Sequence, residues 1–206
     1  MAIGVSARKN KAEPGTALKM VRIEKGWKLA DVARMTGFSV STLSKIENGK
    51  SGLSYTKMMR LGQSLGVDIA QLLAKSDSAG AIPSPAPTTG RIASGTRTIT
   101  KAEAAPVVVD NVYNHVCHAA ELLRRSLHPM ITEVKARSIE EFGELRKHPG
   151  EEFSFVLEGV IDLYCDQYTP ARLHPGDSIY FDAGMGHAFI AVSDGPCRIL
   201  SVFSET

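Results

Sequence analysis

Between residues 16 and 73 the apolar positions recur at helical spacing, in short runs that end at glycines. Glycine is the usual residue just beyond the last turn of a helix, since it adopts positive φ without strain. The pattern predicts helices over 17–25, 28–35, 40–48 and 55–65, and a fifth that Asp68 caps and that carries Ile69, Leu72 and Leu73. We therefore expect a small five-helix bundle.

The most informative stretch of this region is 29–48, LADVARMTGFSVSTLSKIEN. Val32, Leu43 and Ile46 are apolar at positions that would face inward from two short helices crossing at a steep angle. Gly37 lies where the chain must turn, and Ser39 can cap the helix that follows. These spacings predict a helix-turn-helix.

Beyond about residue 97 the pattern changes to that of β-strands. Runs rich in Val, Ile, Phe and Tyr are separated by Gly, Pro and Asp, and they lie at 107–116, 130–136, 152–165, 177–184, 187–194 and 197–204. Many short strands at such spacing favour an antiparallel β-barrel or jelly roll. The expected fold class is thus two-domain α + β, with a helical N-terminal part and a β-rich C-terminal part.

The segments outside these patterns suggest the domain boundaries. Residues 76–97 are rich in Ser, Ala, Pro, Gly and Thr and have few large apolar side chains, as in a linker. Residues 1–15 carry Arg8, Lys9 and Lys11 among small residues and are expected to be a flexible basic arm. The helical domain would then occupy 16–75 and the β domain 98–206.

Charge and cysteine content add to this division. Residues 1–75 hold 13 Lys and Arg against 5 Asp and Glu, a net of +8, whereas the other residues hold 11 against 17, a net of −6. A basic helical part suits nucleic acid binding.

Cys117, Cys165 and Cys197 are odd in number and form no CxxC pair, which argues against a disulfide framework and fits a reducing cytoplasm. No apolar run is long enough to span a membrane, so we expect a cytoplasmic protein without a membrane partner.

The run STLSKIENGK at 41–50 and its flanks resemble the phage-repressor-like helix-turn-helix domains of the XRE family, over roughly residues 16–73. The resemblance implies that the third helix enters the major groove of double-stranded DNA. It nominates Val40, Ser41, Thr42 and Lys45 as base-contacting residues, with Ser39 and Lys28 near the DNA backbone. A phosphate or solvent contact is the alternative for each. It also implies a structural salt bridge between Arg22 and Glu47.

Two further stretches carry more than strand pattern. They are RKHPGEEFSFVLEG at 146–159 and HPGDSIYFDAGMGH at 174–187. Together they resemble the two sequence motifs of the cupin superfamily, whose metal-binding members use two His and a Glu from the first motif and a His from the second. His148, Glu152 and His187 occupy three of these places, and Arg146 stands at the first His position.

Three interpretations of this site remain open. In the first, the three residues hold a metal such as Fe, Mn or Zn, and Arg146 orients an anionic ligand. In the second, which we favour, no metal binds and Arg146, His148, Glu152 and His187 form a pocket for a small organic effector. In the third, Arg146 pairs with Glu152 and the site binds nothing. Tyr113, His115, Arg137 and Tyr180 are further pocket candidates.

The two resemblances together are typical of XRE-cupin transcription regulators of bacteria. We therefore expect a homodimer that binds a palindromic DNA operator and whose cupin domain binds a small-molecule effector, such as an amino acid, a polyamine or a small carboxylate. No nucleophile–base pair or phosphate-binding glycine loop is evident, so no catalytic residue is predicted and a non-enzyme is expected. The alternatives are a metal-dependent cupin enzyme of dioxygenase or isomerase type with an autoregulatory DNA-binding domain, and a dimeriser that binds no effector.

Overall fold

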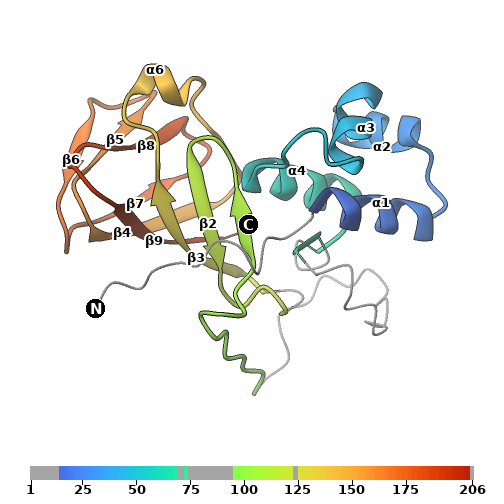
Figure 1. Ribbon diagram of the computed structural model, residues 1–206, viewed down its shortest axis with the longest axis horizontal. Helices are drawn as coiled ribbons and strands as arrows, with labels where there is room; N and C mark the ends of the chain where they lie inside the picture. Colours follow the sequence, from blue (N-terminus) through green and yellow to red (C-terminus); the bar gives the residue numbers. More distant parts are fainter. Residues whose placement is uncertain (1–13, 69–71, 74–94, 123–124, 205–206) are drawn as a thin grey trace. The chain divides into compact units, whose positions relative to one another are not determined.

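The computed structural model describes residues 14–68, 72–73, 95–122 and 125–204. They form two compact units, one helical and one of β-strands (Figure 1). The β unit comprises Val107–Ala119 and the chain from Ser126 onward. Residues 1–13 of the expected basic arm and residues 76–94 of the expected linker lie outside the described residues, whereas residues 14 and 15 belong to the first helix.

The helical unit contains α1 (Pro14–Glu24), α2 (Leu29–Thr36), α3 (Val40–Glu47) and α4 (Tyr55–Leu65). These agree with the expected helices, except that α1 begins three residues earlier, at Pro14. Proline suits the first turn of a helix, where its missing N–H would have no partner in any case. Most of the expected fifth helix lies outside the described residues, although Leu72 and Leu73 are helical and buried.

The core of the helical unit is apolar. Leu18 of α1, Val32 of α2, Leu43 of α3 and Met58 and Leu61 of α4 are all completely buried. Contacts of α2 with both α3 and α4, and of α1 with α3, bring these side chains together; Figure 1 labels the four helices. The spacing of apolar residues therefore predicted Val32, Leu43 and Ile46 as inner residues correctly, whereas Met20, also expected on the inner side of the first helix, is exposed.

The β unit consists of two antiparallel sheets. The larger has the order β1-β2-β3-β9-β4-β7 and the smaller β6-β5-β8. The strands are β1 (Val107–Val109), β2 (Tyr113–Cys117), β3 (Leu127–Val134), β4 (Glu151–Glu158), β5 (Ile161–Cys165), β6 (Ala171–Leu173), β7 (Ser178–Asp182), β8 (His187–Ala191) and β9 (Cys197–Ser204), with the single-turn helix α6 (Ile139–Phe142) between β3 and β4. Strand pairing among the described residues thus gives two sheets, and not the single closed barrel that was one expectation. Neither β6 nor α6 was expected from the sequence.

The two sheets enclose an apolar core to which both contribute. Ile161, Leu163 and Phe189 come from the smaller sheet, and Val156 and Ile199 from the larger. Towards one end of the larger sheet, however, several of the buried side chains are polar: His115, Thr132, Glu152, Ser154 and Ser201. This change from apolar to polar lining marks the place of the candidate site.

No helix within the described ranges is long and apolar enough to cross a membrane.

Candidate functional site

Helix α3 has one buried and one exposed side. Leu43, Ile46 and Glu47 are buried, whereas Val40, Ser41 and Lys45 are exposed and Thr42 is half-buried. The helix begins where the sequence predicts, because the Ser39 hydroxyl accepts a hydrogen bond from the Thr42 N–H at 3.1 Å. Of the residues nominated for base contact, Val40, Ser41 and Thr42 therefore stand together at the N-terminal end of α3, and Lys45 lies in its last turn.

The turn before α3 requires a glycine. Gly37 has a φ of 73° and its N–H donates to the Ala33 carbonyl at the end of α2. A Cβ at this position would lie 2.9 Å from a guanidinium nitrogen of Arg60. Both the left-handed backbone and the close approach of Arg60 favour glycine here.

An ion pair joins α1 to α3. The Arg22 guanidinium donates to both carboxylate oxygens of Glu47, at 2.7 and 2.8 Å, and also to the Trp27 carbonyl at 3.0 Å. Glu47 is buried, so its charge needs such a partner inside the unit. This is the pair that the family resemblance implies, and its position below the exposed side of α3 suits a structural role.

Lys28 stands at the start of α2. Its side chain is exposed, and its backbone N–H donates to the Asp31 carboxylate at 2.9 Å. Leu29, the next residue, is half-buried and offers no polar group to DNA. Of these two residues, only Lys28 can therefore contact a phosphate through its side chain.

In the β unit, His148, Glu152 and His187 come together. One ligand atom from each lies within 4.8 Å of the other two. Nε2 of His148 is 3.3 Å and Nε2 of His187 is 3.7 Å from the same Glu152 oxygen. The rings of Phe181 and Phe203 lie 5.0 Å from His187 and 5.1 Å from His148, respectively. The result is a polar cluster with an aromatic lining.

The backbone explains how these three residues meet. His187 opens β8, and Glu152 lies near the start of β4 with its side chain on the inner face. The His148 N–H donates to the Ala183 carbonyl, which fixes the segment before β4. The tight turn at Gly150 has a φ of 88°, and a Cβ there would lie only 2.2 Å from the Ser204 carbonyl oxygen.

Further hydrogen bonds orient the three side chains. Nδ1 of His187 lies 2.9 Å from the Met185 carbonyl, and Nδ1 of His148 lies 3.2 Å from the Pro149 carbonyl. A carbonyl can only accept, so these contacts place a proton on Nδ1 of each ring and turn Nε2 toward Glu152, where Nε2 of His148 is within hydrogen-bond distance of the carboxylate. The Ser154 hydroxyl donates to the other Glu152 oxygen at 2.7 Å. This is the arrangement by which proteins hold metal-ligating histidines.

Burial and charge shape the ionisation of the cluster. Burial acts to raise the pKa of Glu152, but the hydrogen bond from His148 and the charges of His187 and His148 outweigh it, so the net shift is downward. Burial lowers the pKa of His187. Both shifts favour a carboxylate beside a neutral imidazole, which are the forms that ligate metals.

Arg146 does not pair with Glu152, and the interpretation of the site as an Arg146–Glu152 pair is wrong. Its guanidinium lies 2.8 Å from the Asp110 carboxylate, and it sits over the rings of Tyr113 and Phe142 at 5.0 and 5.4 Å. Burial acts to raise the pKa of Asp110, but the hydrogen bond and charge of Arg146 lower it overall. Asp110 thus neutralises the positive charge of Arg146.

Comparison with known proteins agrees with this division of the chain. A helix-turn-helix family model matches residues 18–72, and a cupin domain model matches residues 138–203. The chain joins an XRE-type helix-turn-helix domain to a cupin domain.

Two curated relatives span most of the chain. The HTH-type transcriptional regulator PuuR of Escherichia coli (strain K12) is 24% identical over 194 residues, covering 94% of this chain and 95% of that protein. The (S)-2-hydroxypropylphosphonic acid epoxidase of Streptomyces wedmorensis is 29% identical over 182 residues, covering 84% and 86%. A solved HTH_3 family transcriptional regulator from Vibrio cholerae has the same fold, with a TM-score of 0.60 and 18% identity over 95% of this chain and 96% of that one.

Other nominated residues of the cupin domain do not all join the cluster. The Tyr113 hydroxyl accepts a hydrogen bond from the Phe189 N–H at 2.9 Å, and His115 lies 2.9 Å from the Thr132 hydroxyl. Tyr180 is exposed and points away from the inner face of β7. Arg137 donates to the carbonyls of Ser193 and Gly195, away from the cluster.

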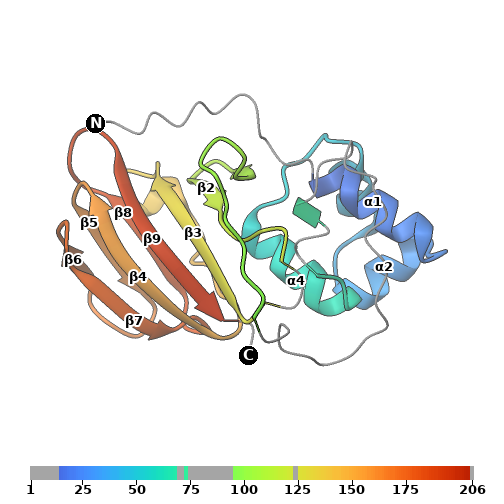
Figure 2. The same ribbon diagram turned by 90° about the horizontal axis from the view of Figure 1, so that it is seen from below.

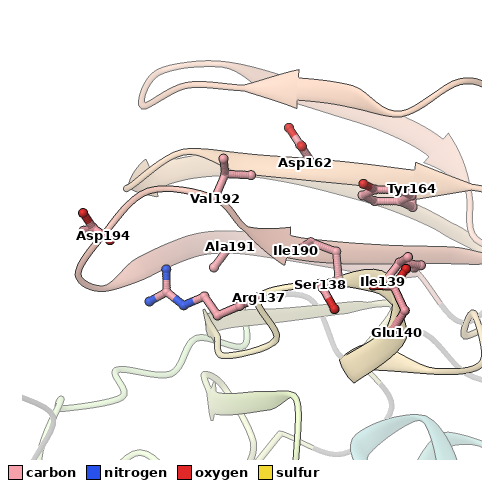
Figure 3. A pocket seen from close by; sticks show the side chains of 10 residues that line it. All are labelled: Arg137, Ser138, Ile139, Glu140, Asp162, Tyr164, Ile190, Ala191, Val192 and Asp194. Atoms are coloured by element: carbon pink, nitrogen blue, oxygen red, sulfur yellow. The ribbon is translucent and has the colours of Figure 1, made fainter.

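Arg137 lines a cavity of about 550 Å³ that is separate from the cluster (Figure 3). Its lining side chains come from α6, the segment before it, β5, β8 and the turn after β8, and they include Glu140, Asp162, Tyr164 and Asp194. His148, Glu152 and His187 do not contribute to it. Figure 3 shows Asp162 and Tyr164 on one wall and Ser138 and Ile139 on the other.

Three residues of the site were not predicted from the sequence. The Ser154 hydroxyl donates a hydrogen bond to Glu152, and the Ser201 hydroxyl lies 2.7 Å from that of Ser154. Their signal is in the sequence, because Glu152 and Ser154 are two residues apart in a strand and so share a face. Asp110 carries no such signal, since it lies in a turn 36 residues from Arg146.

Proposed function

We propose that this chain is a DNA-binding transcription regulator whose cupin domain binds a small-molecule effector and joins two copies of the chain. One observation carries the DNA-binding part: α3 buries Leu43 and Ile46 while its exposed side presents Val40, Ser41 and Lys45. Hydroxyl and methyl groups at the start of a recognition helix, and the Lys45 ammonium group in the last turn of α3, are suited to base edges in the major groove. Ser39 and Lys28 would contact the DNA backbone.

A dimer would explain how such a short helix achieves specificity. Two copies of α3 placed about 34 Å apart would contact successive major grooves on one side of a palindromic operator. Doubling the contacts multiplies the preference for the correct sequence over the many competing sites. A monomer with one eight-residue recognition helix would have only half of these contacts.

The test of this proposal is selection of DNA duplexes from a random library by the full chain, followed by mobility shift with the selected sequence. Ser41, Thr42 and Lys45 are then replaced together by Ala. We expect affinity for the selected duplex to fall at least about tenfold, since base contacts contribute roughly 1–3 kcal/mol each. Lys19→Ala, an exposed lysine on α1, is the control and should have little effect. Unchanged binding of the triple variant would refute the recognition-helix assignment.

The effector proposal rests on the polar lining of the cupin domain. The Arg146 guanidinium stacks on Tyr113 and pairs with Asp110. An anionic ligand can replace Asp110 as the partner of this guanidinium. An effector that prefers one arrangement of the dimer shifts operator affinity by its difference in affinity for the two arrangements. A thermal-shift screen of amino acids, polyamines and small carboxylates tests this, because a true effector stabilises the folded state by mass action. Failure of all three classes to stabilise the protein would favour a dimeriser that binds no effector.

A metal site is the second candidate, and the geometry of His148, Glu152 and His187 favours it. Their ligand atoms converge within 4.8 Å, and both histidines present Nε2 to the same carboxylate. Two His and one carboxylate suit Fe(II), Mn or Zn and leave coordination positions open for a ligand. A bound metal would supply Lewis acidity at those open positions. The similarity to an epoxidase supports keeping a metal-dependent enzyme as the alternative function.

Elemental analysis of protein purified without chelators separates the two candidates. If metal binds, we expect near-stoichiometric Fe, Mn, Zn or Ni that is lost in His187→Ala. His174→Ala, an exposed histidine outside the cluster, should retain it. A metal content that is unaffected by His187→Ala, or no metal after incubation with Fe(II), Mn or Zn, would exclude this site and leave the organic-effector pocket.

A further inference from the structure

The outer face of the six-stranded sheet is apolar, although outer positions of an antiparallel sheet are usually polar. Two adjoining rows of paired residues cross the sheet there. The first row is Val116, Ile131, Leu200 and Phe155 on β2, β3, β9 and β4, and the second is Pro129, Val202, Phe153 and Tyr180 on β3, β9, β4 and β7. None of these residues is fully buried, and Phe153 and Tyr180 are exposed. We call these eight residues the outer apolar face; Figure 2 shows β3, β9 and β4 side by side.

Polar residues border the outer apolar face along the strands. On one side, the Asn114 amide donates to Glu133 at 2.7 Å and Arg198 donates to Glu158. On the other side, Glu151 pairs in register with Asp182, and the Glu151 N–H donates to the Ser204 hydroxyl at 3.1 Å. An apolar centre inside a polar border is the anatomy of a protein–protein interface.

The size of the face matches what a stable dimer needs. With strands about 4.8 Å apart and about 3.3 Å per residue, six strands of up to eight residues cover about 24 by 26 Å, or about 600 Å² in projection. Protruding side chains raise the accessible area above that projection. A standard interface buries about 800 Å² of accessible surface on each partner. The whole outer side of the sheet, which is the outer apolar face together with its polar border, is thus similar in size to one standard interface.

The arrangement of the rows fits a second copy of the chain. A two-fold axis lying between two stacked sheets superposes apolar rows on apolar rows and borders on borders when it runs along the rows or along the strands. Face-to-face stacking of sheets is a common packing mode, with about 10 Å between them. An extended peptide would instead add to a sheet edge, at β1 or β7, and would leave the central strands β3, β9 and β4 uncovered.

We propose that the outer apolar face is the surface through which two copies of this chain pack, sheet on sheet. The inference rests on the proposed function, in which a dimer reads the operator, and it names the surface that forms that dimer.

Sedimentation velocity of the full chain over a range of concentrations tests the surface. Phe153→Lys places a charge at the centre of the second row. Tyr180→Lys places one at the end of that row, and because Tyr180 is 63% exposed, this change should not affect folding. Tyr168→Lys is the matched control, since Tyr168 is 71% exposed in the turn between β5 and β6 of the other sheet. Circular dichroism confirms that each variant is folded.

We expect the wild type and Tyr168→Lys to be dimers, and Phe153→Lys to raise the dimer dissociation constant at least about thirtyfold, as loss of a central aromatic contact does. Tyr180→Lys should weaken the dimer less. If the wild type is a dimer and neither variant raises its dissociation constant, the proposed surface is wrong. The proposed dimeric regulator would not be contradicted by that result. A wild type that stays monomeric, with or without operator DNA, would overturn both the surface and the dimer of the proposed function.

Discussion

The helix-turn-helix domain and the larger sheet of the cupin domain distribute polar and apolar residues in opposite ways. In the helical domain, Leu18, Leu43 and Met58 fill the interior and polar groups of α3 face outward. In the larger sheet, buried Glu152 and Ser201 line part of the interior, whereas apolar side chains stand on the outer face.

This difference indicates where each domain carries its function. A DNA-reading surface must be polar and accessible, so the helical domain can use an ordinary apolar core for stability. A ligand or metal pocket must be enclosed, and the proposed site fits this, because part of the cupin interior consists of polar groups that are hydrogen-bonded to one another. The apolar side chains on its outer surface suit contact with another copy of the chain.

The largest expected effect is on the core of the helical domain. Leu43→Ala should reduce the free energy of unfolding by about 3–5 kcal/mol, since it opens a cavity between α2 and α3. Urea unfolding followed by circular dichroism measures it. The matched change in the cupin domain is Ser201→Ala, which removes one hydrogen bond to Ser154 and should cost about 1 kcal/mol. If the two variants lower the free energy of unfolding by the same amount, the interiors of the two domains do not differ in the way described here.

Much of the helical domain was predictable because its signals are local. Gly37, Ser39 and Leu43 each have a role that follows from a few neighbouring residues: a turn, a cap and a buried helix position. Each of these roles therefore depends on residues that are close together in the chain. The bounds of α2, α3 and α4 were therefore expected to within one residue.

The cupin domain was predictable in its strands and its motif residues but not in its pairings. His148, Glu152 and His187 belong to recognisable motifs, and the structure brings them together. The partner of Arg146 was not predictable, because only the fold brings the turn at Asp110 beside it. Tyr180 was misplaced because a strand shows which residues share a face, but not which face lies inside.

An intermediate effect is expected from acidification of the cupin interior. Burial lowers the pKa of His115 to about 4, against the opposing charge of Asp110 and with smaller contributions from Arg146, Glu152 and Lys135. Protonation therefore favours the unfolded state once the pH falls below the unfolded pKa of about 6.5. From pH 7 to pH 5, His115 alone should reduce the free energy of unfolding by about 2 kcal/mol.

The measurement is urea unfolding at both pH values, on the wild type and on His115→Asn. Asparagine can keep the hydrogen bond to Thr132 without titrating in this range. The variant should lose about 2 kcal/mol less than the wild type on acidification. If the two lose the same amount, His115 is not held neutral by the polar interior, and the pH dependence comes from other groups.

The smallest expected effect separates the two roles of Ser39, which caps α3 and is also predicted to lie near a DNA phosphate. Ser39→Ala should cost about 1 kcal/mol of stability, because the Thr42 N–H loses its acceptor. Ser39→Asp restores an acceptor and should keep the stability, but its negative charge would lie close to the DNA backbone. Affinity for the selected duplex should then fall by roughly tenfold, and more steeply at low salt. If Ser39→Asp binds DNA as tightly as the wild type, this end of α3 does not approach a phosphate, and the docking of α3 in the major groove must be tilted towards Lys45.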